Sequence, residues 1–292
     1  MSNATYQETL DLRDAQAAVG NRLLERKDTI TLASAEAFRT TFWPELNALH
    51  PGDPLPFGLH CLYFLPQLSK SHLRGDGTPL DNGLVPNIPL PRRMFASEEV
   101  EFHRPIRIGE TLIQSSELES VRQRAGNSGP LVFATVRHQI GSALTSWQHT
   151  VFRQASNESD IAPAPPLSLP KADWTRTRTV DPVDLFRFSA LTFNSHRIHY
   201  DLAWARDIEG YKHLVVHGQL VALLLLGFAV EHMGHAKPTR FRMRAQAPVF
   251  CGDEIELRGS RTSDGCQLWA VSRGIVVMQA EVELGKEFGE LE

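Results

Sequence analysis

The chain has 292 residues, which is enough for two cores of roughly 100–150 residues each. Its 42% hydrophobic and 22% charged residues are ordinary for a globular protein. The formal net charge of −4 gives no bulk attraction to nucleic acid or to an anionic membrane surface, so neither is an expected partner. Three widely spaced cysteines, and a first segment without the pattern of a secretory signal, predict a reducing, cytoplasmic location.

The first half of the chain is predicted to form a helix followed by strands. The helix is predicted to begin at Ser34. Alternating segments rich in Val, Ile, Leu and Thr then predict strands over 111–121, 131–140 and 146–153. Residues 70–96 lie between the helix and these strands, and their many glycines and prolines predict turns rather than a regular element.

A proline-rich stretch divides the chain. Residues 157–170 carry four prolines among small residues, a composition that sustains neither a helix nor a central strand. It predicts an extended linker between two domains, which cover 1–156 and 171–292.

The second half repeats the order of the first. A helix is predicted to begin at Asp181-Pro182, with Asp181 as its N-cap. A long apolar helix over 218–233 follows, and then strands over 254–262, 266–272 and 275–284. The apolar run is shorter than the roughly 20 residues that a bilayer requires, so no membrane span is predicted.

A short motif supports this duplication. The pattern Pro-x-x-x-Gly-acidic occurs at 105–110 and again at 248–253, and each copy leads into the strands of its half. An antiparallel sheet with one apolar face needs a cover, and a wholly apolar helix must be enclosed. The predicted fold class is therefore α+β, with two antiparallel sheets that are each wrapped around a central helix.

Three residues in the second half have the chemistry needed to add or remove water beside a thioester carbonyl. His199 is the candidate general acid and base, because imidazole titrates near neutral pH. Asn194 is uncharged and can only orient water or substrate through hydrogen bonds. Gly218 begins the apolar helix, where a free N–H stabilises an enolate oxygen. The alternatives are a structural histidine, a turn-forming asparagine and a glycine needed only for packing.

Four further residues are predicted to contact the substrate. Arg197 can pair with a substrate carboxylate, or it can hold loop carbonyls or Asp201 instead. His217 fits a helix-capping or packing residue better than a second base, and it joins His196 among the predicted contacts. Arg244 alternates with two other arginines on a predicted strand and can reach phosphates, although a solvated strand face explains it equally well. The 12 histidines have no metal-binding spacing, so neither a metal nor a cofactor is predicted.

The polar motif resembles that of a known family. Residues Phe193 to His199 align without gaps with Gly-Asp-x-Asn-Pro-Ile-His, the motif of MaoC-type and (R)-specific enoyl-thioester hydratases. Asn194 stands at the Asp position and Phe193 at the first Gly. Two curled units with the motif only in the second are similar to the double hot dog fold of that family. The resemblance implies a hydratase or dehydratase of enoyl thioesters.

The departures from the motif resemble one branch of that family. Leu-Thr-Phe-Asn-x-His-Arg-Ile-His-Tyr-Asp, from Leu191 to Asp201, is similar to mesaconyl-C4-CoA hydratases and mitochondrial type 2 hydroxyacyl-thioester dehydratases. Residues 90–94, 101–105 and 128–132 are similar to the same branch. The resemblance implies a homo-oligomer and an acyl-CoA substrate, for which a short branched dicarboxylic ester such as mesaconyl-C4-CoA is favoured. A dehydratase of 3-hydroxyacyl-ACP, a thioesterase and a non-catalytic acyl-binding protein are the alternatives.

Overall fold

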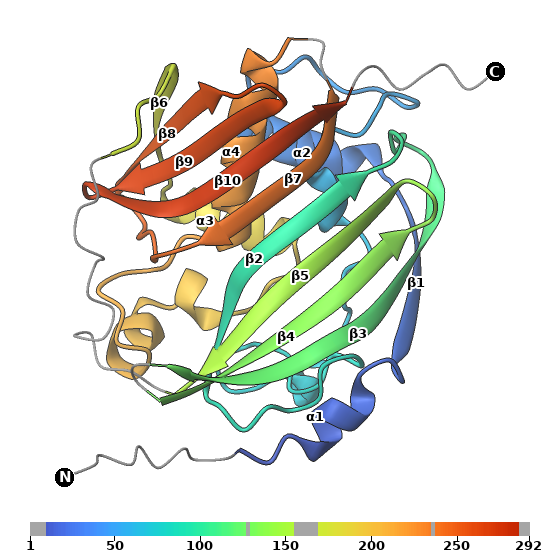
Figure 1. Ribbon diagram of the computed structural model, residues 1–292, viewed down its shortest axis with the longest axis vertical. Coiled ribbons are helices and arrows are strands. Elements are labelled where there is room, and N and C mark those ends of the chain that lie inside the picture. The colour runs from blue at the N-terminus through green and yellow to red at the C-terminus, as the bar shows by residue number, and fades with distance from the viewer. Residues whose placement is uncertain (1–9, 127–128, 155–168, 235–236, 286–292) are drawn as a thin grey trace.

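A computed structural model of the protein describes residues 10–126, 129–154, 169–234 and 237–285. The ten strands within these ranges form one antiparallel sheet, in the order β1-β3-β4-β5-β2-β7-β10-β9-β8-β6 (Figure 1). The elements of the first half are α1 (Arg13–Ala18), β1 (Leu23–Thr29), α2 (Leu32–Phe42), η1 (Leu59–Leu62), η2 (Lys70–His72), β2 (Arg92–Phe102), β3 (Thr111–Gly126), β4 (Gly129–Ile140) and β5 (Leu144–Arg153). Those of the second half are β6 (Trp174–Thr179), α3 (Pro182–Leu191), η4 (Arg197–His199), η5 (Trp204–Ile208), α4 (Gly218–His232), β7 (Lys237–Ala245), β8 (Glu254–Arg261), β9 (Gly265–Ser272) and β10 (Ile275–Gly285).

The order of the strands confirms the predicted duplication. Counted from the outer edge of the sheet inward, the strands of each half follow the same order: first, third, fourth, fifth and second strand of that half. The two halves meet where β2 pairs with β7, from Ser97 opposite Arg244 to Glu101 opposite Arg240. The six predicted strands are confirmed as β3, β4, β5, β8, β9 and β10. The sequence analysis did not predict β1, β2 or β6.

The apolar helix is confirmed in the second half. Helix α4 packs against β7, β8, β9 and β10, and Leu220, Leu225 and Leu226 are fully buried. Residues on every side of this helix are apolar because the curled sheet covers one side and the rest of the core covers the other. The resulting core also holds α2 and α3, whose Phe42 and Phe188 rings pack edge to face.

The first half differs from the prediction, because it contains no matching central helix. Between α2 and β2 the structure has only the short helices η1 and η2. Prolines explain the difference, since each one removes a backbone donor and disrupts a helix interior. Five of them fall between residues 44 and 66: Pro44, Pro51, Pro54, Pro56 and Pro66. The sheet of the first half therefore curls around loops rather than a helix.

Local signals place α3 as expected. The Asp181 carboxylate accepts hydrogen bonds from the N–H groups of Val183 and Asp184, and Pro182 occupies the first turn. Of the predicted linker, 157–170, only the last two residues lie within the described part of the chain, so the domain boundaries stay a prediction. No helix in the described ranges is long and apolar enough to cross a membrane.

Gly227 is a point where two elements approach closely. A Cβ atom at this position of α4 would lie 2.5 Å from the indole Nε1 of Trp43, which is buried at the end of α2. We expect Gly227→Ala to lower the free energy of unfolding by about 1–3 kcal/mol, because overpacking outweighs the better helix propensity of alanine. Urea denaturation measures this change. A more stable variant would mean that Trp43 moves aside without cost.

Candidate active site

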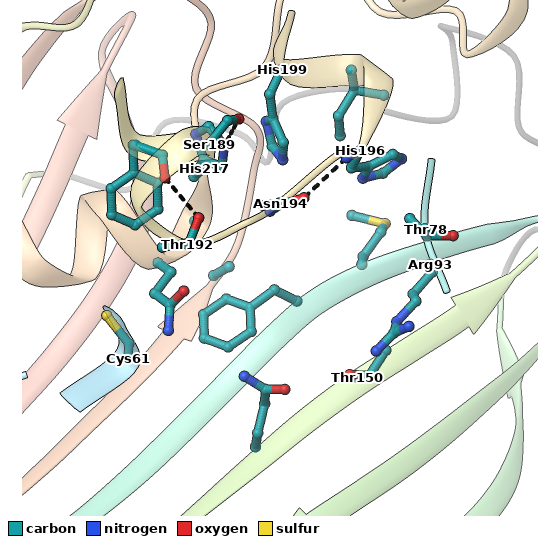
Figure 2. Close-up of a pocket in the computed structure, with 18 of the residues that line it drawn as sticks. Cys61, Thr78, Arg93, Thr150, Ser189, Thr192, Asn194, His196, His199 and His217 are labelled. Atoms are coloured by element: carbon teal, nitrogen blue, oxygen red, sulfur yellow. Dashed lines mark hydrogen bonds between the residues drawn. The ribbon is translucent and has the colours of Figure 1, made fainter. Parts of the chain in front are cut away.

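A large cavity lies between the two halves of the sheet. Its volume is about 1180 Å³, and side chains from both halves line it (Figure 2). Five of the predicted site residues line this cavity together: Asn194, His196, His199, His217 and Gly218. The structure therefore brings together residues that the sequence predicted from two separate segments of the chain, 194–199 and 217–218.

A sharp turn after α3 carries Asn194. The backbone N–H of Asn194 donates to the carbonyl of Ser189, and its side-chain Oδ1 accepts from the N–H of His196 at 3.0 Å. Phe193, just before it, has a φ of +49°, a left-handed conformation that favours glycine. This is the position where the related motif has its first Gly. With Oδ1 occupied, the amide NH2 of Asn194 is the part that remains to orient a ligand.

His199 is buried and held in one tautomer. Its Nδ1 lies 2.8 Å from the carbonyl oxygen of Val215, and a carbonyl can only accept, so Nδ1 carries the proton. Burial, and to a lesser degree the neighbouring His196, lowers the pKa of His199 to about 3, although the bond to Val215 acts in the opposite direction. The ring is therefore neutral at physiological pH, and its Nε2 is available as a proton acceptor.

His217 packs directly against His199. The two imidazole rings stack with centroids 3.6 Å apart, and the Nε2 of His217 lies 2.9 Å from the hydroxyl of Ser189. His217 precedes α4 but makes no side-chain cap for it. Its Nδ1 is buried without a hydrogen-bond partner among the described residues. Of the two structural roles considered for His217, packing agrees with the stacked rings, whereas helix capping does not.

The start of α4 opens toward the cavity. Gly218 lines the cavity, and no side chain caps the helix at His217, so its first backbone N–H groups have no side-chain partner there. Phe95 of β2 lies close by, since a Cβ atom at residue 218 would be 3.2 Å from its ring. A carbonyl oxygen placed at this helix end would meet both a free donor and the positive end of the helix dipole.

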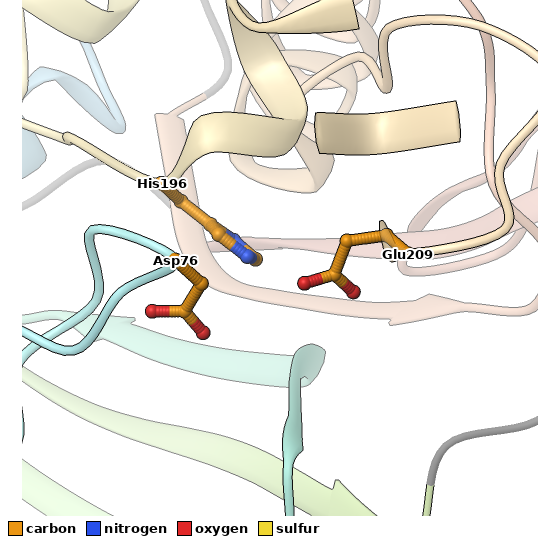
Figure 3. Close-up of side chains that lie close together, drawn as sticks. All are labelled: Asp76, His196 and Glu209. Atoms are coloured by element: carbon orange, nitrogen blue, oxygen red, sulfur yellow. The ribbon is translucent and has the colours of Figure 1, made fainter. Parts of the chain in front are cut away.

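His196 lies between two buried carboxylates. Figure 3 shows its ring between Asp76 and Glu209, and one nitrogen or oxygen atom of each of the three groups lies within 4.8 Å of the others. Glu209 is already ion-paired with Arg92, and Asp76 accepts from the N–H and hydroxyl of Thr78. Burial lowers the pKa of His196 to about 4, and Asp76 opposes that shift. Both carboxylates are thus held by partners other than His196, and no hydrogen bond or ion pair joins either of them to its ring among the described residues.

The turn-rich insertion of the first half holds the site loop in place. The N–H of Arg197 donates to the carbonyl of Asp76 at 2.8 Å, and the hydroxyl of Ser195 donates to the carbonyl of Gly77 at 2.7 Å. A side chain at Gly77 would collide with the backbone of Ser195. The sequence analysis missed this role of Asp76 and Gly77. The only signal was the cluster of glycines around them.

Arg197 does not line the cavity. Its guanidinium donates to one carboxylate oxygen of Asp201 at 2.7 and 3.0 Å and lies 3.9 Å from the centroid of the Trp204 ring. A third bond reaches the carbonyl of Gly75. The prediction that Arg197 binds a substrate carboxylate is not supported by these contacts. They favour the alternative, in which Arg197 holds the loop and Asp201 neutralises its charge.

Arg244 is also outside the cavity. Alternation along β7 places Phe241 and Met243 in the core and turns Arg244 to the opposite, exposed face. On that face, Arg240 and Arg242 form ion pairs with glutamates of β2 and β10. The interpretation of Arg244 as a phosphate ligand is therefore not supported, and the solvated strand face explains it.

The buried histidines make stability depend on pH. Burial lowers the folded-state pKa of His60, His138 and His196 to about 4 and that of His199 to about 3. As the pH falls below about 6.5, the unfolded chain takes up protons that the folded chain does not, so stability must decrease.

We expect the free energy of unfolding to be highest above pH 6.5 and to fall steadily toward pH 4.5, as urea denaturation at several pH values will measure. His138→Gln should flatten this dependence, because it removes one such group while keeping a polar partner for Ser116. Equal stability at pH 7 and pH 5 would show that these histidines are hydrated in the folded protein.

The chain is similar to known proteins over most of its length. The sequence model of hydroxyacyl-thioester dehydratase type 2 matches residues 58–251. The mesaconyl-C(4)-CoA hydratase of Chloroflexus aurantiacus is 42% identical over 93% of this chain and 98% of its own length. The mitochondrial hydroxyacyl-thioester dehydratase type 2 of Schizosaccharomyces pombe is 28% identical over 73% of this chain and 79% of its own length.

A solved structure confirms the fold. A Mycobacterium tuberculosis protein with a double hot dog fold matches with a TM-score of 0.56 and 18% identity, over 90% of this chain and 95% of that one. The strand order described above is the same duplication, so the predicted double hot dog fold is confirmed. The chain belongs to the hydroxyacyl-thioester dehydratase type 2 family.

Proposed function

We propose that this protein adds water to a 2-enoyl thioester and removes it in reverse. The observation that carries the proposal is the meeting, in one cavity, of a neutral His199, the amide of Asn194 and the open end of α4 at Gly218. Each supplies one requirement of the reaction: a proton acceptor, an orienting group and an oxyanion donor.

The chemistry follows from this geometry. The thioester carbonyl accepts from a free N–H at the start of α4, which makes the β-carbon electrophilic. Water held by the NH2 of Asn194 attacks the β-carbon while the Nε2 of His199 takes its proton. The resulting enolate is stabilised at the helix end, and protonated His199 then gives the proton to the α-carbon. Elimination is the same path in reverse.

One part of the cavity favours a short, polar acyl group. The lining is mainly apolar, but on the first-half side it also holds polar or charged side chains from several elements: His60, Glu98, Gln114, His138 and Gln148. A long alkyl chain would desolvate such groups without pairing them. This supports a short dicarboxylic CoA ester of the mesaconyl-C4-CoA type over a long 3-hydroxyacyl-ACP.

The proposal extends to assembly, location and cofactor requirement. We propose a cytoplasmic homo-oligomer that takes acyl-CoA as its substrate and needs neither a metal nor a cofactor. The edge strands β1 and β6 leave backbone groups at which a second copy can pair. The three free cysteines agree with a reducing compartment.

The assay separates the candidate activities. With mesaconyl-C4-CoA, we expect a reversible loss of enoyl-thioester absorbance without release of free thiol. Thiol release at the same rate would indicate a thioesterase. Tight binding with neither signal would indicate a non-catalytic acyl-binding protein, and preferred turnover of long-chain ACP esters would assign the alternative dehydratase.

His199 should carry the proton transfers. We expect His199→Ala to lower kcat by about 10²–10⁴-fold, the usual contribution of a general acid or base. His72 is a suitable control, because it is exposed and bonds only to neighbouring serines, so His72→Ala should keep full activity. A folded His199→Ala variant with normal turnover would remove His199 from the mechanism.

A further inference from the structure

Two cations in the cavity, Arg26 and Arg93, have no counter-ion among the described residues. Four basic side chains line the cavity within the described ranges: Arg26, Lys70, Arg93 and Arg153. Lys70 is exposed to solvent, and Arg153 has partners. Arg93 makes neither a hydrogen bond nor an ion pair with any described residue, and its guanidinium carbon lies 5.8 Å from the centroid of the Phe152 ring.

The surroundings of Arg93 make the lack of a counter-ion energetically unfavourable. Burial, and then the neighbouring Arg74, lower the pKa of the Arg93 guanidinium, with Asp76 acting weakly in the opposite direction. The adjacent arginines are each satisfied: Arg92 binds Glu209 and backbone carbonyls, and Arg74 donates to Asn87 and to carbonyls. A desolvated guanidinium is stable only with an anion beside it.

The strand geometry explains why Arg93 faces the cavity. From Glu98 onward, β2 alternates, with Val100 and Phe102 buried and Glu99 paired to arginines on the outer face. The pairing of β2 with β5 shifts register between Phe95 and Ser97, which reverses this alternation. Arg93 therefore lies on the cavity side of the strand, across from the loop that carries Asn194 and His196 (Figure 2).

Arg93 is also close to the reacting groups. Its charge lowers the pKa of His196, whose ring lies 5.6 Å from that of His199. The charge of Arg26, by contrast, acts on His138 of β4. In a thioester of the mesaconyl-C4 type, the free carboxylate is attached to the β-carbon, which is the atom that water attacks. The anion must therefore bind close to the catalytic histidine. Of the two unpaired arginines, Arg93 is the one that lies across the cavity from the loop that carries Asn194 and His196.

We propose that Arg93 is the residue that binds the free carboxylate of a dicarboxylic enoyl thioester and so selects this substrate class. The inference rests on the proposed function. A bidentate pair between the guanidinium and the carboxylate would neutralise the buried charge and fix the β-carbon beside His199. The sequence suggested this role for Arg197. Arg93 lines the cavity, whereas Arg197 does not.

The test compares two thioesters that differ in one group. Mesaconyl-C4-CoA carries a carboxylate where 3-methylcrotonyl-CoA carries a methyl group. Dissociation constants are measured in a His199→Ala background, so that neither ligand is turned over. We expect Arg93→Gln to weaken mesaconyl-C4-CoA by about 10- to 100-fold and to change 3-methylcrotonyl-CoA by less than about twofold. Arg26→Gln, the matched control, should leave the ratio of the two constants unchanged.

Three outcomes would overturn the inference. Equal weakening of both ligands would place the carrier's phosphate on Arg93, and a selective loss with Arg26→Gln would place the carboxylate elsewhere. A clear drop in the thermal midpoint of the ligand-free Arg93→Met variant would make Arg93 structural, because removing an unpaired buried charge should keep or raise stability. Wild-type turnover is measured separately, so binding without hydration would refute only the proposed function.

Discussion

The pairing of β2 with β7 is the contact on which the rest of the structure depends. It joins two curled sheets into one, so that a single cavity receives side chains from both halves. The same strand pair carries an ionic cluster on its outer face, where Arg240 contacts both Glu99 and Glu101. Backbone hydrogen bonds and these ion pairs hold β2 in register. Phe95 and Arg93 are thereby positioned opposite residues of the second half.

The two halves of the duplicated fold have different interiors. The second half has a dry apolar core around α4, in which Leu220 and Leu225 are fully buried. The first half lacks such a helix in the described ranges and encloses polar side chains instead, among them Glu98, whose pKa burial raises to about 7. The second half provides a packed apolar core, and the first half provides charged side chains that line the cavity. Active sites commonly combine these two features at some cost in stability.

Local sequence signals were sufficient to predict the parts of the site that are close in the chain. The Asp181 cap, the apolar period of α4 and the spacing from Asn194 to His199 depend only on neighbouring residues. Asp76 and Arg93 depend on long-range contacts: one is docked by backbone bonds to residues more than 100 positions away, and the other is turned inward by a register shift. A regular alternation rule predicts neither of them.

Arg197 shows a different limit of the sequence. Both possible partners, a substrate carboxylate and Asp201 four residues later, were compatible with the pattern, and only the structure shows Asp201 occupied. A partner four residues along the chain is available in the free protein, whereas a substrate is not. An arginine with such a neighbour is therefore a poor candidate for recognising a ligand, and an arginine without one is a better candidate.

The same reasoning explains how the site tolerates its departures from the family motif. Phe193 adopts a left-handed φ of +49° where the related motif has glycine, a strain on the order of 1 kcal/mol. The loop is nevertheless fixed on both sides, by Ser189 within α3 and by the carbonyls of Asp76 and Gly77 from the first half. Because contacts from the first half determine the conformation of this loop, the residue types within the loop are less constrained. The first half, which lacks the motif, thus fixes the loop of the second half that carries it.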